Sequence, residues 1–413
     1  MASNEFQPLQ GMSDIVAPDI YLWRMMEERA RSVFSTYGYD ELRTPVLEKI
    51  SVFQRSLGET TDVVKKEMYS FKPSKHELAM RPEGTAGTMR HLAGCGEEGM
   101  NARVFYIAPM FRYERPQAGR KRQFHQVGVE ATGEPNPLAD AECIALQKSL
   151  LDAWGLTGST IKVSTRGELS DRKPVADGLR EALRQYEDGL CEDCQRRIDE
   201  NVLRVVDCKN KHCQKIVDQI PSPTEFMSEE SRNYLNQVIQ ALEAMGVDVT
   251  VDPKLIRGLD YYVHTVWEIS HSALGAQDAV AGGGRYLIDL GRKSIPGVGF
   301  AVGFERAIMA LEACGISGEQ FSPDGGIWLV SLGDTALIEN MKLAQQLRSK
   351  GIRCGMELAA KSMKAQMRKA SRAGANKVII RGDDEIEKEI LVIKDMGQGT
   401  QEEANLSELF EKI

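Results

Sequence analysis

The sequence has no long apolar run and no recognisable leader. No stretch of its 413 residues approaches the roughly 20 consecutive apolar residues that a membrane-spanning helix needs. The opening residues, MASNEFQPLQ, show neither the basic nor the apolar segment of a secretory signal. We therefore expect a cytoplasmic protein that does not associate with membranes.

Cysteine is scarce, and several catalytic motifs are missing. Eight cysteines are too few for a disulfide scaffold in a chain of this length. The sequence contains no GxxxxGK[ST], no G-x-S-x-G and no H-E-x-x-H, so nucleotide would have to be bound by another architecture than the P-loop. It also lacks internal repeats. The content of 42% hydrophobic and 27% charged residues is that of a globular protein, and the length predicts two or three domains.

Negative charge predominates, but it is unevenly spread. The net charge is −8, yet residues 342–381 contain eleven Lys or Arg against one acid, and residues 103–122 contain six against one. A single run of this kind is usually a solvated helix face. Two such blocks on an acidic chain instead favour a polyanion that is steered to chosen surfaces.

Hydrophobic periodicity predicts a mixed fold. Apolar residues at helical spacing predict a helix over 20–37, and alternation predicts a strand over 39–46 and an antiparallel hairpin over 103–133. Residues 171–246 are charge-rich and helical in pattern. Further elements are predicted as a helix at 138–155, strands at 161–164, from 249 and through VHTVWEI, and the glycine-rich SIPGVGF leading into a helix.

The pattern changes after Pro323. Strand and helix then alternate through GIWLVSL, TALIENMKLAQQLRSKG, IRCGMEL, SMKAQMRKASRAG and NKVIIRG, as is typical of a doubly wound α/β unit. The sequence therefore predicts an α+β domain with an antiparallel sheet in two parts, residues 1–170 and 247–320. A helical insertion, 171–246, separates those parts, and a C-terminal α/β domain covers 324–413.

Three arginines have settings suited to phosphate binding. Arg112 lies in FRYERP, Arg257 opens RGLDYY, and Arg306 lies in GFERA at a strand-to-helix turn. The planar guanidinium can hold a phosphate by two hydrogen bonds, and displacement at phosphorus depends mainly on positioning and charge neutralisation. One arginine alone would more often be a surface residue, but the three motifs together favour a site.

These motifs resemble those of a known family. FRYERPQAGRKRQFHQVGVEATG is similar to motif 2 of the class II aminoacyl-tRNA synthetases, GVGFAVGFERAIMAL to motif 3, and TPVLEK, less specifically, to the dimer-forming motif 1. RGLDYY and AGGGRY resemble the two signature peptides of histidyl-tRNA synthetases, and LAMRPEGTAG their substrate loop. The resemblance covers essentially the whole chain in the expected order. It implies the class II synthetase fold with an anticodon-binding domain.

The resemblance also implies a reaction. Histidine and ATP would give histidyl-adenylate and pyrophosphate, and the histidyl group would then pass to the 3′ end of tRNA(His). Arg257 and Arg112 would hold the α-phosphate from opposite sides, and Arg306 the γ-phosphate. Arg120 is a weaker candidate for the phosphates, and Phe124 would stack on adenine unless it is simply a core aromatic of the hairpin.

For the amino acid, the resemblance implies a set of polar side chains. Glu83, Thr85 and Gln126 would hold the α-amino and α-carboxylate groups. Glu130 and Tyr262 would bind the imidazole, with Tyr261 lining the pocket. A neutral imidazole has one donor and one acceptor, so a pocket that supplies both partners rejects other side chains. His125 and His264 lie nearby in sequence and are given no role.

Other partners follow from the same resemblance. We expect a homodimer, Mg²⁺ bound with the ATP, and tRNA contacts from the basic C-terminal block and from residues 115–122. Glu114 is our hypothesis for a ligand of Mg²⁺. One residue departs from the family pattern, since Leu287 follows AGGGRY where an aspartate is usual and Asp289 stands two positions later. We expect this to affect only the detail of a turn.

Four cysteines form a cluster in the predicted insertion. Cys191 and Cys194 form a CxxC, and Cys208 and Cys213 follow with four residues between them. The spacing approximates a zinc ribbon, in which thiolates hold a structural Zn²⁺. Reduced thiols on a charged helical domain are an equally compatible interpretation.

Two other functions fit parts of the sequence. A non-catalytic, histidine-sensing paralogue of the synthetase would lack the C-terminal domain and tend to lose the catalytic arginines, whereas both are present here. A pure RNA-binding protein would use the basic blocks and a zinc site, but it would not explain RPEGT, Glu130 and RGLDYY together. Amino-acid-dependent pyrophosphate exchange distinguishes them.

Overall fold

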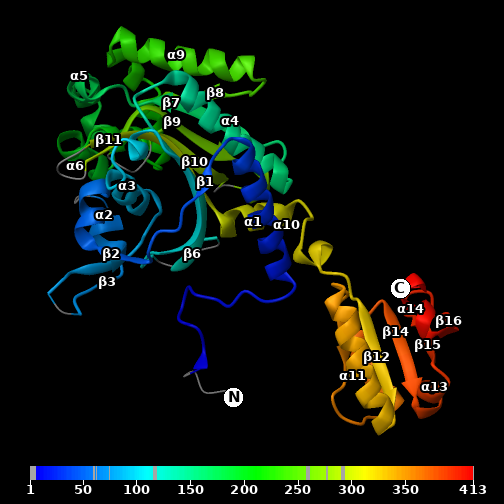
Figure 1. Cartoon of the computed structure of the whole chain (residues 1–413). Helices are drawn as coiled ribbons and strands as arrows, with labels where there is room; N and C mark the ends of the chain where they lie inside the picture. The colour runs from blue at the N-terminus through cyan, green and yellow to red at the C-terminus, as the bar shows by residue number, and fades with distance from the viewer. Residues whose placement is uncertain are drawn as a thin grey trace. The chain divides into compact units, whose positions relative to one another are not determined.

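The computed structural model describes residues 6–58, 61, 63–73, 75–114, 119–256, 261–275, 278–289 and 294–412. The chain divides into two compact units, Met1–Phe321 and Ser322–Ile413, which are taken separately below (Figure 1). None of the described helices has the length and apolar character needed to cross a membrane.

An eight-stranded sheet forms the centre of the first unit. Its strand order is β1-β5-β6-β11-β10-β9-β7-β8, and neighbours are antiparallel except for β1 beside β5 and β7 beside β8. The strands are β1 (Asp40–Glu41), β5 (Arg103–Phe111), β6 (Gln123–Thr132), β7 (Thr160–Thr165), β8 (Thr250–Val251), β9 (Tyr262–Ser270), β10 (Ala279–Asp289) and β11 (Ser294–Gly303). The sheet brings together segments from three distant parts of the sequence.

One face of this sheet is covered by long helices. They are α1 (Asp19–Thr36), α4 (Pro137–Trp154), α9 (Glu229–Ala244) and α10 (Phe304–Ala313). Side chains alternate across a strand, so Trp267 and Phe300 pack with Trp154 and Phe304 in the core on this side. The indole of Trp154 donates to the carbonyl of Met26 at 2.8 Å, which fixes α4 against α1.

The opposite face carries the smaller elements and the polar pocket described below. A three-stranded sheet in the order β2-β4-β3 and two short helices cover it (Figure 1). These elements are β2 (Leu47–Lys49), β3 (Ser70–Phe71), β4 (Leu78–Met80), α2 (Ile50–Leu57) and α3 (Thr85–Ala93). Tyr262, Val266 and Tyr286 point to this side, in alternation with the residues of the long-helix core.

A helical segment is inserted between β7 and β8. It contains α5 (Arg172–Arg184), α6 (Glu192–Glu200), α7 (Leu203–Val206) and α8 (Lys211–Val217) before α9 returns to the sheet. It has a hydrophobic core of its own, built around Val175, Leu179 and Leu183 and including Cys194 and Cys213.

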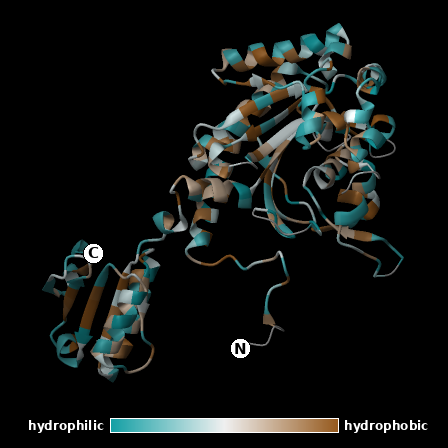
Figure 2. Ribbon diagram, turned by 180° about the vertical axis from the view of Figure 1, so that it is seen from behind, coloured by the Kyte–Doolittle hydropathy of each residue, from teal (hydrophilic) through white to brown (hydrophobic). Residues whose placement is uncertain are grey.

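The second unit is a five-stranded sheet with flanking helices. Its order is β13-β12-β14-β15-β16, with β13, β12 and β14 parallel and the last two pairings antiparallel. Figure 2 shows hydrophobic strands beside helices that turn hydrophilic residues outward. The elements are β12 (Ile327–Leu332), α11 (Asp334–Ser349), β13 (Cys354–Met356), α12 (Met363–Arg372), β14 (Lys377–Gly382), α13 (Asp383–Glu387), β15 (Ile390–Asp395), β16 (Gln401–Asn405) and α14 (Leu409–Lys412).

The predicted fold class is confirmed: an antiparallel catalytic sheet, a helical insertion and a C-terminal α/β unit are all present. Two local predictions were wrong. The strand predicted over 39–46 is reduced to the two residues of β1, because the chain leaves the sheet before Pro45 and pairs again only as β2. The supposed turn after AGGGRY does not exist, since residues 281–289 run straight through β10.

Candidate active site

Glu83 lies just before helix α3 and belongs to a buried polar cluster. Its two carboxylate oxygens accept hydrogen bonds from the backbone N–H groups of Thr85 (2.7 Å) and Ala86 (2.8 Å). These are N–H groups of the first turn, which have no partner within the helix. Burial raises the pKa of Glu83, and the two N–H donors act against that rise. These hydrogen bonds hold a buried acid at the N-terminus of helix α3.

Glu130 lies at the centre of the pocket on β6. Its oxygens accept hydrogen bonds from the Thr85 hydroxyl (2.6 Å) and the Tyr286 hydroxyl (2.7 Å). Burial raises the pKa of Glu130 to about 8, and the nearby Glu83 adds to the rise, while the two hydroxyl donors oppose it. This carboxyl group therefore exchanges its proton close to neutral pH.

Aromatic rings line the same space. The Tyr261 ring makes edge contacts with Tyr262 and Tyr286 at centroid distances of 4.7 and 5.9 Å. On the neighbouring wall, the buried Oε1 of Gln126 has no hydrogen-bond partner among the described residues. A buried acceptor without a partner is costly, so it calls for a donor on a ligand.

Glycines allow close packing around Glu130 and Tyr106. Glu130 on β6 pairs with Gly299 on β11, which in turn pairs with Gly284 on β10. A Cβ on Gly299 would lie 2.1 Å from Oε2 of Glu130, and one on Gly84 would lie 2.2 Å from the Tyr106 ring. The glycine-rich strand thus makes room for the carboxyl and tyrosine groups, rather than forming a loop around phosphate.

Arg112 lies beside this pocket, at the end of the hairpin strand β5. Its Nε donates to the carbonyl of Pro82 at 2.8 Å, next to Glu83, and its guanidinium lies 5.2 Å from the centroid of the Phe124 ring. Phe124, Gln126 and Glu130 stand on one face of β6 because they are separated by even numbers of residues.

A second, open cavity of about 450 Å³ lies at the other end of the sheet face. Arg120 and Arg306 line it together with Glu268 and Asp278. The Arg306 Nε donates to the carbonyl of Ala279 at 2.7 Å. Burial, and then the like charge of Arg120, lower the pKa of Arg306 from a value so high that the group stays charged. Two cations converging on one cavity suit a polyanion.

The predicted residues therefore fall into two groups. Hydrogen bonds join Glu83, Thr85 and Glu130, and aromatic contact joins Tyr261 with Tyr262. Arg112 is packed against Phe124, and Arg120 shares its cavity with Arg306. Glu114 lies 3.7 Å from both Arg112 and Arg120. Arg257, the first residue of RGLDYY, lies outside the described residues.

Sequence reasoning overlooked Tyr286 and Arg285. Tyr286 donates to Glu130, and a strand interpretation of AGGGRY would have pointed it into the pocket. Arg285 points the other way and forms a buried ion pair with Asp140, with nitrogen–oxygen distances of 2.6 and 2.7 Å. It supports the sheet from behind and does not line the pocket.

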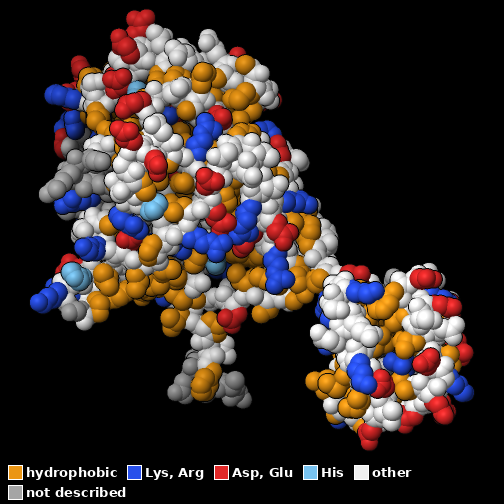
Figure 3. All heavy atoms as spheres, viewed as in Figure 1, with side chains coloured by type: hydrophobic (Ala, Val, Ile, Leu, Met, Phe, Trp, Pro, Cys, Tyr) orange, Lys and Arg blue, Asp and Glu red, His pale blue; other side chains and the backbone are white. Residues whose placement is uncertain are grey.

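On the face shown in Figure 3, basic and acidic side chains are interspersed over the first unit. This face is not uniformly basic. Positive charge is concentrated where Arg120 and Arg306 line the same cavity.

The four cysteines of the insertion converge. One sulfur from each of Cys191, Cys194, Cys208 and Cys213 lies within 4.8 Å of the others, and three of the residues are buried. All four are free thiols. Tetrahedral zinc with bonds of about 2.3 Å requires sulfur atoms about 3.8 Å apart. The Cys191 and Cys208 sulfurs are 3.9 Å apart, so the arrangement fits that geometry.

Comparison with known families shows which proteins this chain is similar to. The model for histidyl-tRNA synthetase matches residues 11–307. The chain belongs to the histidyl-tRNA synthetase family. A model for an anticodon binding domain matches residues 327–413, the part that a sensing paralogue would lack.

Members of the histidyl-tRNA synthetase family are similar to this chain over nearly its whole length. A histidine–tRNA ligase of Halothermothrix orenii is 41% identical, and one of Anaeromyxobacter sp. is 42% identical, each covering 98% of both chains. A crystal structure of apo histidyl-tRNA synthetase from S. aureus superposes with a TM-score of 0.81 at 32% identity, covering 98% of this chain and 99% of that one.

Proposed function

We propose that this chain is a histidine–tRNA ligase. The histidine carboxylate attacks the α-phosphorus of ATP, pyrophosphate leaves, and histidyl-adenylate forms. A terminal ribose hydroxyl of tRNA(His) then attacks the carbonyl carbon, and AMP leaves. The observation that carries the proposal is the buried polar cluster around Glu130, because its acids and hydroxyls suit a polar, ring-shaped side chain.

In this pocket, Glu130 accepts the imidazole N–H, and Tyr262 contacts the other side of the ring while Tyr261 lines the wall. Glu83 attracts the α-ammonium group. Gln126 and Thr85 complete the polar contacts to the main-chain atoms of the substrate, and the partnerless Oε1 of Gln126 supports that role. A ligand without imidazole donates no N–H to Glu130 and leaves this buried acid with only its Thr85 and Tyr286 donors, which is a basis for rejection.

The arginines take the nucleotide. Arg112 and Arg257 neutralise the α-phosphate as charge develops there, Arg306 binds the γ-phosphate, Arg120 assists it, and Phe124 stacks on adenine. The contact of Arg112 with Pro82 supports a position between the two substrates.

Mg²⁺ bound with ATP would supply further positive charge at the phosphates. Carboxylates are its preferred protein ligands, and Glu268 and Asp278 line the phosphate cavity, while Glu114 lies beside Arg112 and Arg120. These three acids are our candidates for holding it.

The C-terminal unit would bind the anticodon loop, where unpaired bases can be read individually. Exposed Lys364, Arg368 and Arg372 on α12 support this assignment. The loop at 115–122, of which residues 115–118 lie outside the described part, would meet the acceptor end. The expected location is the cytoplasm, where tRNA is charged for the ribosome.

A homodimer is part of the proposal. Strand β1 is the edge of the eight-stranded sheet, beside α1 and the exposed Leu47 of TPVLEK. Sheet edges are sites of further pairing, and a two-fold contact there would use the same surface on both subunits.

The four cysteines would hold a structural Zn²⁺, which the sulfur geometry supports. Metal analysis of the purified protein, beside Cys191→Ser and Cys208→Ser variants, tests this assignment. About one zinc per chain in the wild type and a loss of zinc in both variants is expected. Metal-free protein would leave reduced thiols as the correct interpretation.

The test of the function is ATP–pyrophosphate exchange with each of the twenty amino acids in turn. Exchange that depends on L-histidine alone is expected. Absent exchange, or exchange independent of histidine, would overturn the proposal.

A further inference from the structure

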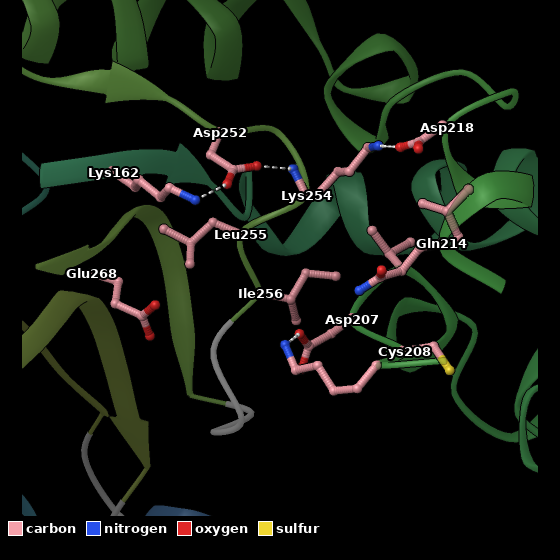
Figure 4. Close-up of a pocket in the computed structure, with 13 residues that line it drawn as sticks. Lys162, Asp207, Cys208, Gln214, Asp218, Asp252, Lys254, Leu255, Ile256 and Glu268 are labelled. Carbon is pink, nitrogen blue, oxygen red and sulfur yellow. Dashed lines mark hydrogen bonds and ion pairs between the residues drawn. The ribbon is translucent and has the colours of Figure 1, made fainter. Parts of the chain in front are cut away.

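Lys209 connects the helical insertion to the phosphate cavity. It belongs to the short link between α7 and α8, yet it lines the cavity that contains Arg120 and Arg306. It also lines an adjoining cavity of about 440 Å³, and Glu268 is the other residue common to both. In Figure 4, Asp207 and Cys208 lie on the opposite side of this adjoining cavity from Glu268.

The backbone around Lys209 is fixed on both sides. Before it, the sulfur of Cys208 lies within the four-cysteine cluster and accepts a hydrogen bond from the backbone N–H of Asn210 at 3.5 Å. After it, the Asn210 side chain accepts from the N–H of His212 at 2.9 Å and caps helix α8. The cysteine cluster thus determines where Lys209 emerges.

Among the described residues, the ammonium group of Lys209 has one ion-pair partner, and that partner is exchangeable. It donates to Asp207 at 2.6 Å, and the side chains are 83% and 37% exposed. An exposed pair of this kind is worth about 0–1 kcal/mol, so a multiply charged phosphate can replace the aspartate. The other lysines of the adjoining 440 Å³ cavity are Lys162 and Lys254. They are paired with Asp252 and Asp218 and do not line the cavity of the two arginines.

We propose that Lys209 binds the β- and γ-phosphates of ATP, and that the four-cysteine cluster holds it in position to do so. The inference rests on the proposed function, because the ligand is the ATP of histidine activation. A triphosphate is the favoured ligand because Arg120 and Arg306 line the same cavity. The insertion would then contribute a cation to a site otherwise built from the catalytic sheet.

Lys209→Ala, Lys209→Arg and the matched control Lys211→Ala test the contact. Lys211 is exposed, two residues away, and lines neither cavity. In histidine-dependent pyrophosphate exchange without tRNA, we expect Lys209→Ala to raise the KM for ATP about tenfold, as for loss of one charge-assisted hydrogen bond. Arginine should restore most of the loss, the KM for histidine should stay within twofold, and Lys211→Ala should behave as wild type.

Two outcomes would overturn this contact. Equal ATP KM values for Lys209→Ala and Lys211→Ala would show that Lys209 does not touch the nucleotide. A rise confined to the KM for tRNA in aminoacylation would assign Lys209 to an RNA phosphate instead. In both cases, wild-type exchange that depends on histidine would leave the proposed function standing.

A double-mutant cycle tests the role of the cluster. Cys191→Ser, across the cluster from Lys209, should raise the KM for ATP nearly as much as Lys209→Ala, and the double variant should show little further rise because the two changes act on one contact. Circular dichroism and histidine KM establish that the serine variant is folded. Additive effects, or a folded Cys191→Ser variant with normal ATP KM, would contradict the positioning role.

Discussion

The two pockets on one face of the catalytic sheet are built in opposite ways. The polar cluster around Glu130 is buried, and its acids already have partners, two hydroxyls on Glu130 and two N–H groups on Glu83. The phosphate cavity is open, and Arg306 and the half-exposed Arg120 reach it from the surface. Recognition of one ring needs fixed partners in a dry pocket, whereas a polyanion needs reachable positive charge. Under the proposed function, selectivity is assigned to the cluster around Glu130 and nucleotide affinity to the cavity of Arg120 and Arg306.

The largest effect is expected where the two substrates meet. Arg257→Ala should reduce pyrophosphate exchange about 10³-fold, because loss of a cation at a charged transition state has effects of this size. The thermal unfolding profile and tRNA binding should be nearly unchanged. Loss of folding would instead identify Arg257 as a structural residue.

Glu130→Gln should reduce kcat/KM for histidine about 10- to 100-fold, because a hydrogen bond to a charged acceptor is lost. The same variant should be more stable at pH 8. The folded protein binds a proton at Glu130 up to a pKa of about 8, whereas the unfolded chain releases it near pH 4.5. Stability of the wild type therefore falls as pH rises between these values, by on the order of 5 kcal/mol.

Thermal unfolding at pH 5 and pH 8 checks the second half of this prediction. The melting temperature of Glu130→Gln should exceed that of the wild type at pH 8, and the two should converge at pH 5. A variant less stable than the wild type at both pH values would show that the carboxylate supports the fold.

Arg306→Ala tests whether the nucleotide site can be weakened without affecting the histidine site. The KM for ATP should rise roughly 10- to 30-fold through loss of a charge-assisted contact, while the KM for histidine stays within twofold. Initial rates of exchange over both substrate concentrations measure this. An equal rise in both constants would mean that the two pockets act as one unit.

Gly299→Ala should affect the histidine site instead of the nucleotide site, and its effect should be somewhat smaller than that of Arg306→Ala. Its Cβ would displace Glu130, so the KM for histidine should rise about tenfold and the KM for ATP little. Gly303→Ala on the same strand is the control, because a Cβ there meets nothing within 4 Å. Similar kinetics in the two variants would contradict the close packing around Glu130.

Local patterns in the sequence predicted much of this arrangement. The hairpin of β5 and β6 and the helices α1 and α4 follow from periodicity alone, because neighbouring residues make their contacts. The alternation of β6 was also available, and it places Phe124, Gln126 and Glu130 together. Family motifs supplied the remaining site residues.

Contacts between residues far apart in the sequence could not be predicted from local patterns. A strand over AGGGRY would place Tyr286 and Arg285 on opposite faces, but it does not identify Glu130 and Asp140 as their partners, because both come from distant segments. The second unit likewise ends in antiparallel strands β15 and β16, which the alternating strand-helix pattern did not anticipate. Sheet order and side-chain pairing depend on how segments meet, and periodicity does not encode that.

Calorimetric titration with L-histidine between pH 6.5 and 8.5 tests most directly whether the buried polar cluster around Glu130 selects histidine. Accepting the imidazole N–H requires the carboxylate form of Glu130, whose pKa is about 8 in the free protein. We expect wild-type affinity to rise across this range with release of a proton, and Glu130→Gln to bind weakly with a flatter profile. Identical pH profiles for the two proteins would contradict the account.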